Sequence, residues 1–353
     1  MDVKYFAILG IIFAFFLNTA DAAVCGGPVQ CNCGDTLVAS QSMWYDLSCP
    51  TNVALFINTS NVTLDCNGHG IIGIPPATSG IGIDGSSGVT ITECNIRGFY
   101  EGVKVTSSPN SRIIGNQFQN NYGKAIYVLY GASKGSEIRG NKFVGNRNYA
   151  ILLVHGGFHK VTGNLIRDGG YAIYLDSSGG SNGEISGNII ENNTGFGIAV
   201  VGGRNGVYAN NIIKKSRLGF YGGAFQRNRI YGNAIDGNSY YGMLFENSVD
   251  GNVIWNNKFT SNAISAHEMF GADYGTYNNS WNLSTTGNLW SDFASNPGYP
   301  STYIIGGPGD GIDYHPLKKR ICKPSSPLAL SVKGGLIDAD PDCEVAIRAE
   351  AKA

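Results

Sequence analysis

Residues 113–259 carry a repeated arrangement of apolar and polar positions. In each copy, two residues separate a bulky apolar residue from an asparagine, and one more separates that asparagine from a second bulky apolar residue. The copies are Ile113–Asn116–Phe118, Ile138–Asn141–Phe143, Val161–Asn164–Ile166, Ile185–Asn188–Ile190, Val207–Asn210–Ile212, Ile230–Asn233–Ile235 and Ile254–Asn257–Phe259. Successive asparagine numbers differ by 25, 23, 24, 22, 23 and 24, a period typical of solenoid repeats. We therefore predict a repeat protein.

The residues between the asparagines predict strands and turns. Runs such as 150–154, 172–176 and 197–201 are rich in Ile, Val and Tyr and are bounded by Gly and Asn. Helical spacing does not persist, leucine is too sparse for a leucine-rich repeat, and the glycine-rich calcium repeat is missing. The fold that remains is an all-β, single-stranded parallel β-helix of about nine to ten coils, stacked about 4.8 Å apart. We expect a right-handed helix, because parallel crossovers are right-handed.

The recurring asparagine has two expected roles. Asparagine tolerates the left-handed backbone of a sharp turn, and its amide can bond to the equivalent amides one coil above and below. We therefore expect an internal ladder of side chains. The alternative is that these asparagines are loop residues or sugar acceptors.

One apolar strand precedes each copy of the repeat. Its inward residues are expected at Ile81, Val103, Ile126, Ile151, Ile173, Ile198, Phe220, Met243 and Ile264. Strand alternation then turns the following residue outward. The expected outward row is Gly82, Lys104, Tyr127, Leu152, Tyr174, Ala199, Tyr221, Leu244 and Ser265. The row two positions on is Asp84, Thr106, Leu129, Val154, Asp176, Val201, Gly223, Glu246 and His267.

Three tyrosines of the first outward row are candidate carbohydrate contacts. Tyr127, Tyr174 and Tyr221 would present rings that stack on sugars and hydroxyls that bond to sugar hydroxyls. The alternative is that tyrosine simply suits strands.

Charged side chains offer weaker candidates for chemistry. Glu246 and His267 are expected at matching positions on adjacent coils, where they could form a base and its orienting partner. Glu268 would join them as a catalytic candidate, although a regular strand turns it to the opposite face, and Asp273 follows. A possible metal set is His155, His159 and Asp176, against plain surface residues. A weak calcium site is possible at Asp310 and Asp313, against a structural turn.

Both ends of the chain differ from the repeats. Residues 1–22 place Lys4 before an apolar run and end in Ala20-Asp21-Ala22, which predicts a secretory signal peptide. The eight cysteines lie outside the central repeats and predict disulfides that cap the solenoid. We favour the pairs Cys25–Cys31, Cys33–Cys49, Cys66–Cys94 and Cys322–Cys343, with other connectivities and a zinc site left open.

Composition agrees with export and excludes some partners. The net charge is −1 and only 14% of residues are charged, so no basic stripe indicates nucleic acid or anionic lipid. Sequons that could carry glycans stand at Asn58, Asn61, Asn192, Asn278 and Asn282. We expect a secreted or cell-surface monomer with a cap over 23–50, repeats over 51–270, irregular final coils over 271–317 and a strapped tail over 318–353.

Two terminal segments carry a family resemblance. The phrase Asp65-Cys66-Asn67-Gly68-His69 follows a Cys-Gly-Asp-Thr opening at Cys33, and the repeats close on residues 286–293, Thr-Gly-Asn-Leu-Trp-Ser-Asp-Phe. Together with the repeats, they resemble exported right-handed β-helix proteins of the NosD-like, carbohydrate-binding and sugar-hydrolysis type over most of residues 33–317.

The resemblance is specific for the fold and leaves three functions open. The first is binding of a polysaccharide or surface glycan along the exposed sheet without strong catalysis. The second is a polysaccharide lyase or glycoside hydrolase. The third is a periplasmic accessory protein for metal-enzyme maturation, although only 4 Met and cysteines expected to be oxidised offer few soft copper ligands.

Overall fold

The computed structural model describes residues 23–50, 52–74, 77–130, 133–269, 278–309 and 311–318, with the backbone of 320–321 and 343–344. The predicted signal peptide, Cys322, Asp273 and Asp310 lie outside the described residues, so the predicted Cys322–Cys343 pair does too.

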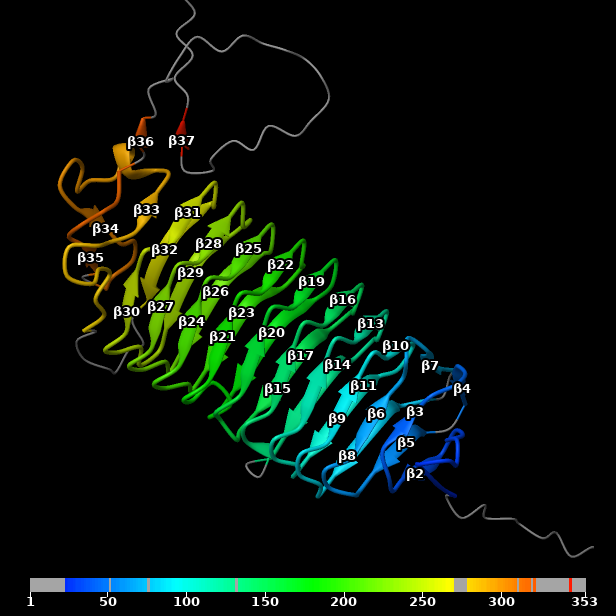
Figure 1. The fold of residues 1–353 in the computed structure, drawn as a ribbon. Helices are drawn as coiled ribbons and strands as arrows, with labels where there is room; N and C mark the ends of the chain where they lie inside the picture. Colours follow the sequence, from blue (N-terminus) through cyan, green and yellow to red (C-terminus); the bar gives the residue numbers. More distant parts are fainter. Residues whose placement is uncertain are drawn as a thin grey trace, which may run out of the picture.

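The chain winds into a parallel β-helix with three long sheets that run along its axis (Figure 1). Each repeat adds one strand to each sheet, and the strand pairs in parallel with its counterparts one coil before and one coil after. The predicted all-β parallel solenoid is therefore confirmed. A short antiparallel pair, β34 (Tyr303–Ile304) and β35 (Ile312–Asp313), follows the last coils with the 3₁₀ turn Phe293–Ser295. Arg320–Ile321 (β36) pairs with Cys343–Glu344 (β37).

The three sheets contain the following strands. The twelve-stranded sheet is built from β1 (Val24–Cys25), β2 (Asp35–Leu37), β5 (Val53–Ile57), β8 (Ser79–Asp84), β11 (Glu101–Thr106), β14 (Lys124–Leu129), β17 (Tyr149–Val154), β20 (Tyr171–Asp176), β23 (Phe196–Val201), β26 (Leu218–Gly223), β29 (Tyr241–Glu246) and β32 (Ile264–Met269). The ten-stranded sheet is built from β3 (Gln41–Ser42), β6 (Thr63–Asp65), β9 (Thr90–Thr92), β12 (Arg112–Ile114), β15 (Glu137–Arg139), β18 (Lys160–Thr162), β21 (Glu184–Ser186), β24 (Val207–Ala209), β27 (Arg229–Tyr231) and β30 (Val253–Trp255). The eleven-stranded sheet is built from β4 (Leu47–Cys49), β7 (Gly70–Gly73), β10 (Asn95–Arg97), β13 (Gln117–Gln119), β16 (Lys142–Val144), β19 (Leu165–Arg167), β22 (Ile189–Glu191), β25 (Ile212–Lys214), β28 (Ala234–Asp236), β31 (Lys258–Thr260) and β33 (Leu289–Trp290).

An asparagine ladder runs inside the turns between the ten- and eleven-stranded sheets. At one rung, the Oδ1 atom of Asn141 accepts hydrogen bonds from the backbone N–H (2.8 Å) and Nδ2 (3.1 Å) of Asn116. Its own Nδ2 donates to the Ile113 carbonyl (2.8 Å) and to Asn164 Oδ1 (3.1 Å). The ladder comprises Asn116, Asn141, Asn164, Asn188, Asn211, Asn233, Asn257 and Asn288. Because each buried amide is satisfied by its neighbours, the ladder stabilises the stacking of coils.

Two details of the predicted ladder are wrong. The fifth rung is Asn211 and not Asn210, since Ile185 pairs with Tyr208 rather than with Val207. The left-handed backbone also belongs to the residue before each rung from Asn116 to Asn257, which is usually glycine, as at Gly187 (φ 63°). Asn210 takes this turn position with φ 55°. Because Asn210 and Asn211 are adjacent, the sequence pattern fits two registers that differ by one residue.

The ladder ends on a carboxylate. The backbone N–H of Asn288 donates to Asp313 Oδ2 (2.7 Å), which also accepts from Trp290 Nε1 (2.9 Å). Each rung donates its backbone N–H and Nδ2 to an acceptor on the next coil, so an acceptor-only side chain is a suitable terminator. Burial raises the pKa of Asp313 even though these hydrogen bonds oppose the shift.

The amino-terminal coils are fastened by three disulfides. They join Cys25 to Cys31, Cys33 to Cys49 and Cys66 to Cys94, which confirms three of the predicted pairs. Disulfides are typical of proteins outside the cytoplasm. Within the described ranges, no helix is long and apolar enough to cross a membrane.

Candidate functional site

The outer face of the twelve-stranded sheet presents three rows of side chains. In strand β17, Ala150, Ile151 and Leu153 face the interior, while Tyr149, Leu152 and Val154 face outward. Two inward residues in succession break the simple alternation, so each strand of six residues has three outward positions. The first outer row is Ser79, Glu101, Lys124, Tyr149, Tyr171, Phe196, Leu218, Tyr241 and Ile264. The second is Gly82, Lys104, Tyr127, Leu152, Tyr174, Ala199, Tyr221, Leu244 and His267. The third row is the last residue of each strand, namely Asp84, Thr106, Leu129, Val154, Asp176, Val201, Gly223, Glu246 and Met269.

The expected register of the last strand is wrong by two residues. Met243 pairs with Ala266, and Ile264 is an outward residue that is 39% exposed. The apolar pattern had favoured the bulkier side chain for the interior. His267 therefore belongs to the second outer row beside Leu244 and is not level with Glu246, which pairs with Met269 of the third row. The predicted matching of Glu246 with His267 does not occur.

The predicted tyrosines lie on the second outer row, as expected. Tyr127, Tyr174 and Tyr221 are each half-buried. First-row aromatic rings pack beside Tyr174 and Tyr221, and the Lys124 ammonium lies beside Tyr127. Ring centroids lie 5.0 Å apart for Tyr149 and Tyr171 and 5.3 Å apart for Phe196 and Tyr221. We call the outer face from β14 to β29 the aromatic segment. The first-row aromatics were missed because strict alternation assigns them no outward row, although they recur with the same period as the repeat.

Carboxylates border the aromatic segment along the third row. Tyr221 Oη donates to Glu246 Oε2 at 3.0 Å, and burial together with the Glu246 charge raises the pKa of Tyr221. Burial also raises the pKa of Tyr174, with Asp176 adding to the shift. Burial lowers the pKa of His267, and the Glu246 charge only partly opposes this. At neutral pH, Tyr174, Tyr221 and His267 are therefore uncharged hydrogen-bonding groups.

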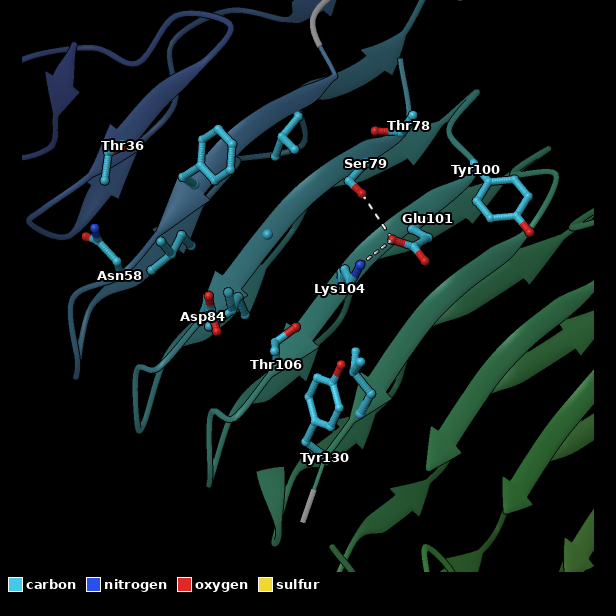
Figure 2. Close-up of a pocket in the computed structure, with 16 residues that line it drawn as sticks. Thr36, Asn58, Thr78, Ser79, Asp84, Tyr100, Glu101, Lys104, Thr106 and Tyr130 are labelled. Carbon is cyan, nitrogen blue, oxygen red and sulfur yellow. Dashed lines mark hydrogen bonds and ion pairs between the residues drawn. The ribbon is translucent and has the colours of Figure 1, made fainter. Parts of the chain in front are cut away.

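A groove of about 850 Å³ opens beside the aromatic segment, over strands β5 to β14 (Figure 2). Gly82 leaves a hollow in the second row, where an added Cβ would come no closer than 3.6 Å to Val53 and 3.8 Å to Phe56. Figure 2 shows Ser79, Glu101 and Lys104 converging within the groove. The sequence pattern correctly placed Gly82 and Lys104 in one outward row. It did not predict the groove, because the groove depends on the absence of a side chain at Gly82.

The charges in the groove compensate one another. Glu101 is buried and accepts a hydrogen bond from Ser79 Oγ at 3.2 Å. Its carboxylate pairs with Lys104 Nζ at 3.4 Å and Lys124 Nζ at 3.8 Å. The Lys124 ammonium also lies 4.8 Å from the ring centroid of Tyr127.

Glu268 faces the interior, as strand alternation had indicated. It is 2% exposed and accepts hydrogen bonds from Trp281 Nε1 (2.9 Å) and Asn279 Nδ2 (3.2 Å). Asn279 is the last rung of a shorter ladder with Asn228 and Asn252, so this ladder also ends on a carboxylate. Glu268 therefore does not reach the outer face on which Glu246 and His267 lie.

The predicted histidine metal set does not assemble. His159 is buried, its Nδ1 accepts from the Ser136 N–H (3.2 Å), and its Nε2 donates to the His155 carbonyl (3.1 Å). In the part of the chain that the structure describes, no group of three His, Cys, Asp or Glu side chains could hold a metal ion. Calcium binding at Asp310 and Asp313 stays a prediction, because Asp310 lies outside the described residues.

The fold and the outer face define a parallel β-helix protein with an aromatic sheet face. A family model described as "Periplasmic copper-binding protein (NosD)" matches residues 56–217 and 181–295. The chain belongs to this family, and its disulfides are consistent with an extracytoplasmic location.

Copper does not fit the described residues. Their six cysteines are joined in disulfides, and both ring nitrogens of His159 are bonded to the backbone. Copper sites use imidazole, thiolate or thioether ligands grouped in one place, and no group of three His, Cys, Asp or Glu side chains that could hold a metal ion occurs among the residues described.

Solved β-helix enzymes share the fold. A double mutant of the periplasmic alginate epimerase AlgG aligns with a TM-score of 0.51 and 15% identity over 71% of this chain and 66% of its own. The A-module of the mannuronan C-5 epimerase AlgE6 from Azotobacter vinelandii aligns with a TM-score of 0.51 and 15% identity, covering 82% of this chain and 81% of that one. No curated protein sequence matches significantly.

Proposed function

We propose that the protein binds a polysaccharide along the outer face of its twelve-stranded sheet, with Tyr127, Tyr174 and Tyr221 as the principal contacts. Sugar rings stack on aromatic faces, and tyrosine hydroxyls bond to sugar hydroxyls. The observation that carries the proposal is the aromatic segment, which continues across successive coils of a stiff sheet.

The repeat geometry suits a long ligand. Adjacent strands lie about 4.8 Å apart, so a polymer parallel to the helix axis would meet equivalent outward positions on each coil. Tyr174 on β20 and Tyr221 on β26 are separated by one intervening strand, β23. Ala199 lies between them in the second row and is fully buried. The two fold relatives are named as an alginate epimerase and a mannuronan C-5 epimerase, and the polysaccharides in these names agree with this class of ligand.

Binding is tested by screening the full chain on a polysaccharide array and measuring the best ligand by calorimetry. We expect Tyr174→Ala and Tyr221→Ala each to weaken binding about tenfold, since one stacking contact contributes on the order of 1.5 kcal/mol. The matched control is Tyr231→Ala, because Tyr231 stacks on Trp255 on the outer face of a different sheet, the ten-stranded one. Equal affinities for all of these variants would remove the aromatic segment from the proposal.

Catalysis near Glu246 is the second candidate function. The Tyr221 hydroxyl bonded to Glu246 places a proton-bearing group beside a carboxylate on the same face. Because His267 is not level with Glu246, the two residues do not form the predicted catalytic pair, which weakens the case for a lyase or glycosidase. Assays for reducing ends and unsaturated products test it, with Glu246→Gln as the variant. Product release that this variant abolishes would establish an enzyme.

A further inference from the structure

The outward rows of the aromatic segment contain acidic residues but no basic ones after β14. From β17 to β32, the six strands of the twelve-stranded sheet contain no lysine or arginine. Their outward carboxylates are Asp176 and Glu246, both half-buried in the third row. Arginines occur in the turns that flank these strands, with Arg147 and Arg217 before β17 and β26 and with Arg204 and Arg227 after β23 and β26.

The lysines at the other end of the face do not offset these carboxylates. Lys104 and Lys124 both pair with Glu101, and Asp84 adds another carboxylate beside them in the groove. The three outward rows therefore carry four carboxylates and two ammonium groups. Both ammonium groups already pair with Glu101.

The excess of carboxylates over ammonium groups on this face favours some classes of polysaccharide over others. A uronate polymer carries a carboxylate on each sugar, and these charges would lie near Asp176 and Glu246, on strands that contain no lysine or arginine. Electrostatic screening at physiological salt extends over about 8 Å, which exceeds the spacing of about 4.8 Å between coils. Neutral sugars would instead donate hydroxyl hydrogen bonds to the same carboxylates.

On the condition that the proposed polysaccharide binding holds, we infer that the ligand is a neutral polysaccharide without carboxylate or sulfate groups. The ligand class thus differs from the mannuronan named for one fold relative. Asp176 and Glu246 are then specificity-determining residues, since they accept hydroxyl hydrogen bonds and repel acidic chains.

The inference is tested with ligands that differ only in charge. One pair is cello-oligosaccharide and the same oligosaccharide oxidised to the uronate at C6, and the other is methyl-esterified and de-esterified homogalacturonan. Calorimetry on the full chain is carried out at low and at high salt. We expect each neutral member to bind at least tenfold more tightly at low salt, and we expect the difference to shrink as salt screens the repulsion.

The double variant Asp176→Asn, Glu246→Gln removes both charges and keeps acceptors for Ser177 N–H and Tyr221 Oη. We expect it to reduce the preference for neutral ligands to about threefold or less. The control Glu184→Gln, Asp236→Asn removes two charges from the outer faces of the other sheets and should leave the preference unchanged.

The possible results separate the two levels of the proposal. Tighter binding of the acidic member at low salt, weakening as salt is added, would overturn the inference and leave polysaccharide binding intact. Equal preference in the double variant and the wild type would also overturn the assigned role of Asp176 and Glu246. Absence of binding to every member of a wider neutral and acidic panel would overturn polysaccharide binding itself.

Discussion

The inside and the outside of each coil follow different rules. The interior repeats one asparagine from Asn116 to Asn288 and surrounds it with fully buried apolar residues. The outer face of the twelve-stranded sheet changes along the same axis, from a compensated charged groove at Glu101 to aromatic rings at Tyr171 and Tyr221. The repeated interior residues specify the solenoid fold. The changing outward residues give one segment of the twelve-stranded sheet a surface chemistry of its own.

The largest expected effect separates two adjacent asparagines. Asn211→Ala should lower the free energy of unfolding by about 3–5 kcal/mol, because the Asn188 amide and the Ile185 carbonyl lose buried partners. Asn210→Gly should change it by about 0.5 kcal/mol or less, since glycine also adopts the left-handed turn. Urea unfolding measures both, and equal effects would contradict the assignment of Asn211 to the ladder.

The end of the ladder should be nearly as sensitive as its middle. Asp313→Ala removes the acceptor of the Asn288 N–H and of Trp290 Nε1, and should cost about 2–4 kcal/mol. Thermal and urea unfolding measure this loss. If the variant unfolded like the wild type, the carboxylate would not be the terminator that we assign.

The interior should also give the protein an acid-sensitive element. Burial lowers the pKa of His159, so the folded chain keeps it neutral while the unfolded chain takes up a proton below about pH 6.5. Acid therefore favours unfolding, by up to about 1.4 kcal/mol per pH unit from this residue. Unfolding free energies measured from pH 7 to pH 5 should show a shallower acid slope for His159→Asn. An identical slope would contradict this assignment.

The smallest effect is expected on the outer face. Lys104→Ala should change the free energy of unfolding by about 0.5 kcal/mol or less, because its pair with Glu101 is partly exposed and Lys124 remains nearby. Urea unfolding of the variant measures this change. A loss above about 2 kcal/mol would show that the charged groove stabilises the coils, and it would contradict the distinction between a stabilising interior and an outer face that contributes little stability.

The sequence predicts the interior better than the surface. The repeat places most ladder rungs because a buried amide and its apolar neighbours must recur on every coil. It errs where the pattern is degenerate, at the adjacent pair Asn210 and Asn211, and where a small residue faces the interior, at Ala266.

The candidate site was only partly predictable for a related reason. Tyr127, Tyr174 and Tyr221 follow from alternation, but two consecutive inward residues in each strand create a further outer row that alternation does not describe. The groove arises from the absence of a side chain at Gly82 and from the pairing of distant charges. Both features depend on how neighbouring coils pack, which a linear pattern does not contain.

The most direct test is a crystal structure of the protein with the neutral oligosaccharide that binds it most tightly. We expect sugar rings stacked on Tyr174 and Tyr221, running along the coils, with hydroxyls within hydrogen-bonding distance of Asp176 and Glu246. Sugar bound on either of the other two sheets, with the aromatic segment left bare, would contradict this expectation.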